Sequence, residues 1–340
     1  MKTRKCSFDV LRCIAILFVL INHRDIYSYF LNFDVWNIKY VISMIISIFC
    51  KSACPIFFMI SGALLLGKEE TYYTIFVHRI CRILSAMVLF SIVYIICNQG
   101  TIEMLGGLLL RNSNWYLYAY LAFLIMLPFF RSMVQGMDKV KFRIFLVLVA
   151  VFYAMPVFIS SGILGNLTLF CAPWASSSWH IVFPILGYYY THWNELEVGE
   201  KEKKLQKVII SVGTIVSIAV CIILMSNDIV QKEGQNLEML RQYAILFPTC
   251  LIFVAINEHN EKVSNLNNKL KQIIFTASVA SFGIFLLEVY TPINNLIDQF
   301  LQANLVTNYI TMYIYIIIEL VVDTVIITIL REIPLLKTIL

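Results

Sequence analysis

The chain has 340 residues, of which 60% are hydrophobic and only 14% are charged. A soluble domain of this length carries more charged surface, and the recurring long apolar runs exclude a protein that only lies on a membrane surface. The formal net charge of +5 is no evidence for nucleic-acid binding, because the basic residues lie mainly between the apolar runs, where they set membrane orientation. We therefore predict an all-α, polytopic integral membrane protein.

About ten transmembrane helices are predicted, from apolar runs close to the roughly 20 residues that cross a bilayer. No Ala-rich cleavage site follows the first run, which is therefore interpreted as a retained helix and not as a signal peptide. The sixth and eighth runs are short, so a re-entrant or half-length element is an alternative at either position. The predicted ranges are 8–30, 40–67, 80–98, 115–133, 142–160, 179–192, 208–226, 243–257, 273–290 and 309–330.

The distribution of basic residues predicts the orientation. An even number of helices places both termini on one side, and nineteen of the 26 basic residues fall on that side against five on the other. Because cytoplasmic loops are enriched in Lys and Arg, we predict a multi-pass protein of the plasma membrane with both termini in the cytoplasm.

No appended soluble domain is predicted, since the longest polar stretch, 194–207, is only a charged loop. Residues 1–340 are accordingly expected to form a single transmembrane domain. The uncharged stretch 154–178 contains two prolines and two glycines, and we expect it to form a lid or a re-entrant hairpin on the outer face.

The first predicted helix carries Asp9, Arg12 and His23 within an apolar run. At 100° per residue, Arg12 and His23 fall within about 20° of one helix face, roughly 16 Å apart along the axis. Charged groups in a membrane helix usually face a partner, a cavity or a substrate path. The pattern indicates a polar path through the membrane, with Arg12 in the cytoplasmic half and His23 in the outer half.

Short motifs along the chain resemble those of the membrane acyltransferase-3 family. The resemblance covers most of the chain, in the expected order and with the expected ten helices. The matching positions are Arg12 and His23 with ten residues between them, Pro55, Phe57, Phe58, Ser61, Gly62, Leu64 and Leu65 in the second helix, Arg79 and Arg82 at the third, Trp115, Tyr116, Leu117 and Pro128 in the fourth, and 281–287 near the end.

This resemblance implies a membrane O-acyltransferase. Members usually move an acetyl group from acetyl-CoA, the co-substrate, to a hydroxyl group of a carbohydrate or other acceptor at the cell surface. The chain departs from the pattern in one place, because many relatives have a His where this chain has Glu288. No metal is expected: Cys50 and Cys54 are one helical turn apart, but no second pair or His cluster completes a site.

The acceptor side of the predicted site contains His23 and Glu288. Imidazole can take a proton from a hydroxyl near neutral pH, and Glu288 is expected at a comparable depth, where a carboxylate can orient the His23 ring. The pattern leaves open whether His23 acts as a base or briefly carries the acyl group. The alternative is that both residues only touch interfacial water.

The donor side contains Arg12, Arg79 and Arg82. Arg12 is expected to contact the phosphopantetheine arm or the thioester carbonyl, or alternatively to pair with Asp9 three residues earlier. Arg79 and Arg82 are predicted at the N-terminus of the third helix, a suitable place for the phosphates of CoA. Their alternative role is membrane orientation and contact with lipid headgroups.

Two aromatic residues and further buried charges complete the set. Trp115 and Tyr116 are predicted to belong to the belt of aromatic residues at the membrane interface. Alternatively, Trp115 is a surface on which a sugar ring stacks. Lys51 is expected to neutralise Glu319 or Asp323, with a functional role for Glu319 as the alternative. Ser61 and Gly62 are expected to allow close helix packing.

Two other functional classes fit a membrane protein with buried charges. A transporter or flippase of a glycan or lipid-linked intermediate should show internal symmetry between its halves, but the charged first helix has no counterpart later in the chain. A sensor subunit has little support, because no soluble domain that could report a signal is expected.

Overall fold

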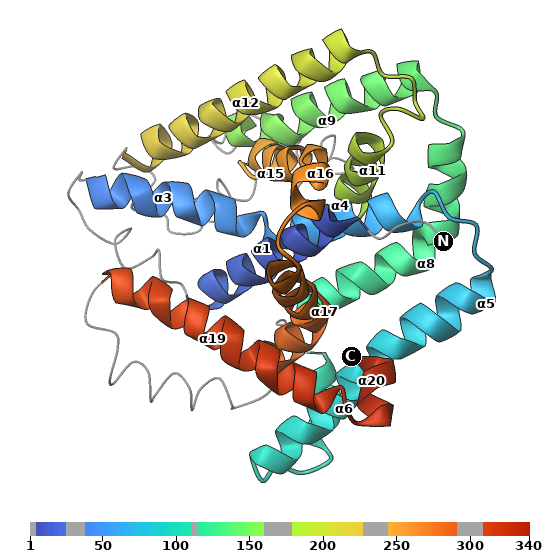
Figure 1. The fold of residues 1–340 in the computed structure, drawn as a ribbon, viewed down its shortest axis with the longest axis vertical. Coiled ribbons are helices and arrows are strands. Elements are labelled where there is room, and N and C mark those ends of the chain that lie inside the picture. Colours follow the sequence, from blue (N-terminus) through green and yellow to red (C-terminus); the bar gives the residue numbers. More distant parts are fainter. Residues whose placement is uncertain (1–4, 25–37, 111–113, 160–178, 227–243, 291–308) are drawn as a thin grey trace. The chain divides into compact units, whose positions relative to one another are not determined.

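The computed structural model describes residues 5–24, 38–110, 114–159, 179–226, 244–290 and 309–340. All regular elements among these residues are helices, as predicted (Figure 1). They fall into two compact units: residues 1–26, 69–128 and 261–340 form the first, and residues 27–68 and 129–260 form the second. The prediction of a single domain is not tested by this division. The predicted outer hairpin lies largely outside the described residues.

The first unit is organised around α1, which packs against α17 and α19. The buried residues of α1 include Leu11, Ala15 and Val19, spaced so that one stripe of the helix faces its neighbours. The elements of this unit are α1 (Cys6–His23), α5 (Tyr72–Ile75), the π-helical turn η1 (Phe76–Ile80), α6 (Cys81–Cys97), α7 (Met104–Leu109), the first part of α8 (Trp115–Gln135), α17 (Asn268–Tyr290), α19 (Tyr309–Leu330) and α20 (Pro334–Ile339); the short α16 (Asn260–Ser264) lies at the boundary of the units.

The third predicted helix begins earlier than expected. Its N-cap is Thr71, whose hydroxyl accepts a hydrogen bond from the Thr74 backbone N–H at 3.3 Å. The chain then continues without interruption through α5, η1 and α6. The predicted start at residue 80 is therefore wrong, because a threonine cap nine residues upstream supports a polar first part of the helix.

The second unit contains α3 (Ile38–Lys51), α4 (Ala53–Leu65), the end of α8, α9 (Lys139–Ile159), α11 (Trp179–Thr191), α12 (Glu200–Ser226) and α15 (Leu246–Glu258). The predicted second helix is divided between α3 and α4 at Ser52. Pro55 has no N–H to donate to the Lys51 carbonyl, which explains the break at this position. The buried Arg131 of α8 donates from Nε to the Leu65 carbonyl oxygen at 2.9 Å.

Helix α12 also begins earlier than predicted, at Glu200 instead of residue 208. The predicted charged loop 194–207 is thus half helical. Glu200 and Glu202 lie in the first turn, where the positive end of the helix dipole favours carboxylates. Lys203 donates to Glu200 at 2.8 Å, which adds an i,i+3 pair on the exposed face.

Helices α4 and α11 are in backbone contact through two glycines. A Cβ atom built on Gly62 would lie 1.9 Å from the Pro184 carbonyl oxygen, and one built on Gly187 would lie 2.0 Å from the Met59 carbonyl oxygen. Each glycine thus removes the side chain that would separate the two backbones. The predicted close packing at Gly62 is confirmed, and its partner is α11.

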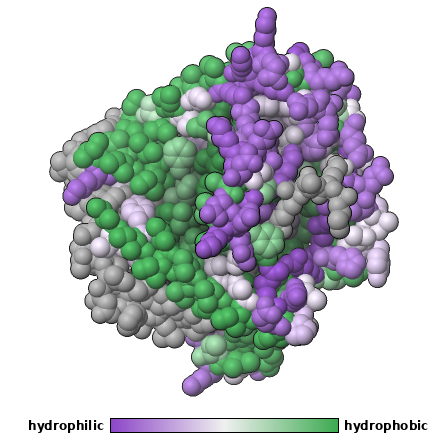
Figure 2. All heavy atoms as spheres, viewed as in Figure 1, coloured by the Kyte–Doolittle hydropathy of each residue, from purple (hydrophilic) through white to green (hydrophobic). Residues whose placement is uncertain are grey.

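Seven helices among the described residues are long and apolar enough to span a membrane. A helix is present in every one of the ten predicted ranges, but α9, α11 and α15 are not among these seven; ten spans are not confirmed. The exposed side chains of α19 include Ile310, Ile317, Val321 and Ile329, and the surface over this helix is hydrophobic in Figure 2. This surface suits contact with lipid.

Candidate active site

The C-terminal end of α1 places a histidine and an arginine next to buried carboxylates. His23 is the last residue of α1, and Arg24 follows as the C-cap, with its backbone N–H bonded to the Leu20 carbonyl. His23 Nδ1 lies 3.3 Å from Glu288 Oε1 on α17. The His23 side chain is 38% exposed while Glu288 is 5% exposed, so the imidazole is the accessible group of the pair.

Glu288 therefore occupies the position expected from its predicted depth, and the contact with His23 is confirmed. Because Nδ1 faces the carboxylate, the other ring nitrogen, Nε2, is the one available to a substrate. A carboxylate in contact with one ring nitrogen in this way fixes the orientation of the imidazole ring. The catalytic roles assigned to the two residues stay predictions.

Arg24 joins two carboxylates from different helices. Its Nη1 and Nη2 atoms lie 3.1 Å from Glu288 Oε1 and Oε2, respectively, and Nη2 also forms an ion pair with Glu319 Oε1 of α19. The Glu319 side chain is fully buried. A guanidinium can hold both carboxylates because its donors form a rigid planar fork. Arg24 thus connects the C-terminal ends of α1 and α17 with the middle of α19.

No role was predicted for Arg24, which lies in the predicted range 8–30 and was counted among the five basic residues of the outer side. Lys51 was expected to neutralise Glu319 or Asp323, but the ion-pair partner of Glu319 is Arg24. A signal for this pairing is present in the sequence: Arg24 directly follows His23, and Glu288 was expected at the same depth. A buried carboxylate at that depth requires a cation, and Arg24 was the nearest one.

The first half of α1 holds a second polar cluster. Arg12 Nη1 donates to Asp9 Oδ1 at 3.1 Å, and Ser278 of α17 donates to the same oxygen at 2.8 Å. The pairing with Asp9 that the sequence offered as one alternative is therefore confirmed. The Arg12 side chain remains 25% exposed. Because Asp9 contacts residue 278 and His23 contacts residue 288, α1 and α17 run in the same direction.

Aromatic residues at the start of α8 pack against Phe285 of α17, which lies one helical turn before Glu288. The Tyr116 ring meets the edge of Phe285 on α17 with a centroid distance of 5.5 Å. Trp115 packs edge-on against Tyr116 at 6.1 Å and is 48% exposed. Tyr116 is thus part of the packing beside the polar cluster, while Trp115 offers an aromatic surface to a ligand.

A family model described as an acyltransferase domain matches residues 7–330. The chain belongs to the acyltransferase-3 family. The comparisons with curated proteins and with solved structures give no match. Family membership makes the protein a multi-pass membrane O-acyltransferase, an enzyme that needs a lipid bilayer, an acyl donor and a hydroxyl acceptor.

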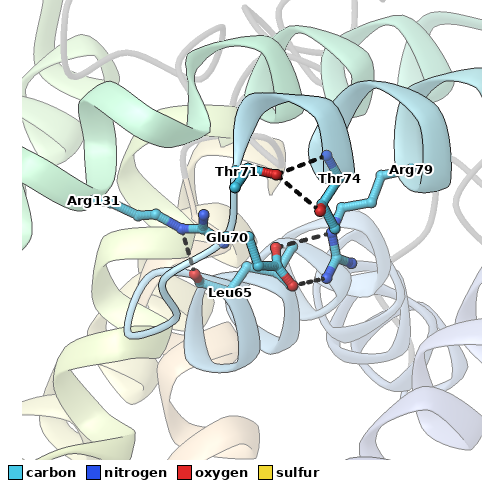
Figure 3. A network of polar contacts seen from close by, with 6 residues as sticks. All are labelled: Leu65, Glu70, Thr71, Thr74, Arg79 and Arg131. Carbon is cyan, nitrogen blue, oxygen red and sulfur yellow. Dashed lines mark hydrogen bonds and ion pairs between the residues drawn. The ribbon is translucent and has the colours of Figure 1, made fainter.

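The two arginines expected to bind the donor phosphates of this acyltransferase already have protein partners. Arg79 forms a double hydrogen bond with Glu70, with Nη2 at 2.6 Å and Nε at 3.3 Å from its oxygens (Figure 3). Arg82 donates to the backbone oxygens of Ile339 and Leu340, each at 2.9 Å. An incoming phosphate must replace these partners or share the donors that remain.

Their position in the helix also differs from the prediction. Because the helix begins after Thr71, Arg79 lies within η1 and Arg82 in the first turn of α6, not at a helix N-terminus. The predicted contribution of the helix dipole to phosphate binding at these arginines is therefore wrong. The π-helical turn, a feature often found at functional sites, changes the helix register at Arg79 instead.

Proposed function

We propose that this acyltransferase moves an acetyl group from cytoplasmic acetyl-CoA to a hydroxyl of a cell-surface glycan, with His23 as the general base. The observation that carries the proposal is the contact of the half-exposed His23 with the buried Glu288 at 3.3 Å. Such a pair presents one ring nitrogen to the substrate and holds the other. The plasma membrane and cytoplasmic termini are part of the same proposal, supported by the distribution of basic residues.

In the proposed reaction, His23 Nε2 removes the proton from the acceptor hydroxyl as its oxygen attacks the thioester carbonyl carbon. The imidazolium is stabilised by Glu288, which Arg24 holds in place through two hydrogen bonds. The C–S bond then breaks, and the CoA sulfur leaves with the proton returned by His23. The products are an acyl ester and free CoA.

Arg12 is proposed to contact the pantetheine arm or the thioester carbonyl. Its support is the partly exposed guanidinium on the same helix as His23. Asp9 and Ser278 restrict the direction of the Arg12 side chain, so the ion pair and the donor contact are compatible. Arg79 and Arg82 are proposed to bind the nucleotide end of CoA. Trp115 is proposed to stack on a sugar ring, for which its exposed face is suitable.

The experiment is acyl transfer by membranes that contain wild-type protein or the variant His23→Ala, with acetyl-CoA labelled in the acetyl group. We expect wild-type membranes to label surface glycans, and the histidine variant to lose the transfer while it still inserts. His259→Ala is the matched control, because that exposed ring is hydrogen-bonded to the Ala255 carbonyl of the preceding helical turn. Retained transfer by His23→Ala refutes the role of His23 as base.

The same membranes separate a base from an acyl carrier. If His23 carried the acyl group, labelled protein would accumulate when the acceptor is omitted. We expect no label on the protein under those conditions, because the proposed attack on the thioester is direct.

A further inference from the structure

The second unit contains a cavity of about 560 Å³ between α9, α11, α12 and α15. Its volume is in the range of small-molecule sites. The walls are mainly aliphatic and aromatic, and the lining includes Leu146, Val147, Ala150, Leu186, Tyr190, Leu205, Ile209, Ile210, Leu246, Phe247 and Cys250. A cavity with such walls binds an apolar group in preference to water.

The cavity is bordered by side chains at the protein surface. Val147 of α9 and Leu205 and Ile209 of α12 line it and are 62%, 60% and 50% exposed, respectively. Helix α12 is one of the seven candidate membrane spans, so this exposed aliphatic surface faces hydrocarbon when the protein is in a bilayer. A lipid chain can therefore enter from the side.

One end of the cavity is polar and is lined by more basic than acidic side chains. Arg143, Lys201 and Glu202 line this end, where Glu202 accepts two hydrogen bonds of 2.7 Å from Arg143. Lys139 adds a further cation 3.3 Å from Glu202. Two basic side chains thus contact one carboxylate, and Lys201 is a third basic residue at this end. The attraction between these charges and an anion is strongest at this end.

The charged and apolar linings follow each other along the same two helices. Helices α9 and α12 both begin at the charged end, since Arg143 is the fifth residue of α9, Glu202 is the third residue of α12, and the two are in contact. The apolar lining follows in both helices, to Ala150 in α9 and Ile210 in α12. From Arg143 to Ala150 the cavity extends about 10 Å along the helix axis. This order, charge first and hydrocarbon next, is that of a phospholipid leaflet.

We propose that this cavity binds one acyl chain of an anionic phospholipid, with the phosphodiester headgroup at Lys201 and Arg143. Basic pockets between membrane helices bind anionic headgroups by the same combination of charge and apolar depth. The lipid site lies in the second unit and does not depend on the function proposed for His23 and Glu288, which belong to the first.

The test is native mass spectrometry of the full chain in detergent, with phosphatidylglycerol or phosphatidylcholine added at equal concentration. We expect one bound phosphatidylglycerol and weaker binding of the zwitterionic lipid. Lys201→Gln should weaken phosphatidylglycerol binding about fivefold and leave phosphatidylcholine binding unchanged. Ala150→Phe should remove binding of both lipids, because the ring fills the cavity.

Two control variants make the same chemical changes outside the cavity. Lys203→Gln removes a cation from the same helix, where Lys203 pairs with Glu200 and Asn194. Val151→Phe adds a ring at a position of α9 that is 49% exposed and does not line the cavity. Both should bind phosphatidylglycerol like the wild type.

Three results overturn the proposal. The first is equal binding of the two lipids by wild-type protein, and the second is an equal loss of affinity in Lys201→Gln and Lys203→Gln. The third is displacement of the lipid by glycerol 3-phosphate at equal concentration, which would make a soluble anion the ligand. If Ala150→Phe does not fold, the comparison of the two lysine variants still decides, since replacing Lys by Gln adds no bulk at either position.

Discussion

Replacing Arg24 with methionine is expected to destabilise the protein strongly. The substitution keeps an unbranched side chain of similar reach but removes the guanidinium that contacts Glu288 and Glu319. The Glu319 side chain has an exposed fraction of zero, while that of Arg24 is 13%. Loss of the guanidinium therefore leaves the Glu319 carboxylate buried without its ion-pair partner.

The expected magnitude follows from this burial. Removing one member of a buried ion pair costs about 3–5 kcal/mol of unfolding free energy, mainly because the remaining charge is not solvated. Lys207→Met is the comparison, since it removes a cation from the exposed pair with Glu258, whose side chains are 40% and 32% exposed. Exposed pairs contribute about 0–1 kcal/mol. The two substitutions should differ by at least about 2 kcal/mol.

The assay is equilibrium unfolding in mixed detergent micelles, followed by circular dichroism, for Arg24→Met, Glu319→Gln and the double variant. We expect the double variant to be more stable than Arg24→Met, because a neutral amide at position 319 no longer requires a cation. If Arg24→Met costs no more than Lys207→Met, or if Glu319→Gln restores nothing, the buried ion pair does not stabilise this protein and the reasoning is refuted.

Three further predictions concern activity, packing and donor binding. Glu288→Gln should lower kcat about 100-fold with little change in the KM for acyl-CoA, as measured by acetyl transfer across pH values; an unchanged kcat contradicts its positioning role. Gly62→Ala should destabilise the protein by about 3 kcal/mol or more in the same unfolding assay, since the new methyl group overlaps a backbone oxygen. Gly106→Ala is the control and should have little effect, because the space around its Cβ position is open. Joint replacement of Arg79 and Arg82 by Gln should raise the Kd for acetyl-CoA about tenfold or more, and an unchanged Kd in detergent titrations excludes them from the donor site.

Local charge pairs could be predicted from the sequence because helix geometry alone determines them. Asp9 and Arg12 are three residues apart, so they share a helix face and pair as expected. His23 and Glu288 required one more assumption, the depth of each residue within its helix, and this assumption was sufficient to bring them together.

Pairs between different helices were not predictable in the same way. Arg24 and Glu319 are separated by 295 positions, and hydropathy gives no rotation of one helix about its axis relative to another. Arg24 was counted only among the basic residues that set the orientation of the protein. Burial, which decides its partner, is a property of the packed helices α1, α17 and α19.

Helix starts were the least accurate part of the prediction. Hydropathy detects the apolar section of a helix, whereas the backbone continues as far as a cap and favourable first-turn charges allow. Thr71 and Glu200 extend their helices into polar sequence that was assigned to loops. For this reason the positive potential of a helix N-terminus was wrongly assigned to Arg79 and Arg82, although that N-terminus lies at Thr71.

The reciprocal glycine contact between α4 and α11 limits how the second unit can move. Side chains between two helices can change rotamer and so permit sliding, but at Gly62 and Gly187 carbonyl groups of the opposite helix occupy that space. Translation of one helix along the other would bring a residue with a Cβ atom into this position and is blocked sterically. During turnover α4 and α11 must therefore move as one rigid body, and any motion that admits a substrate has to occur in other helices.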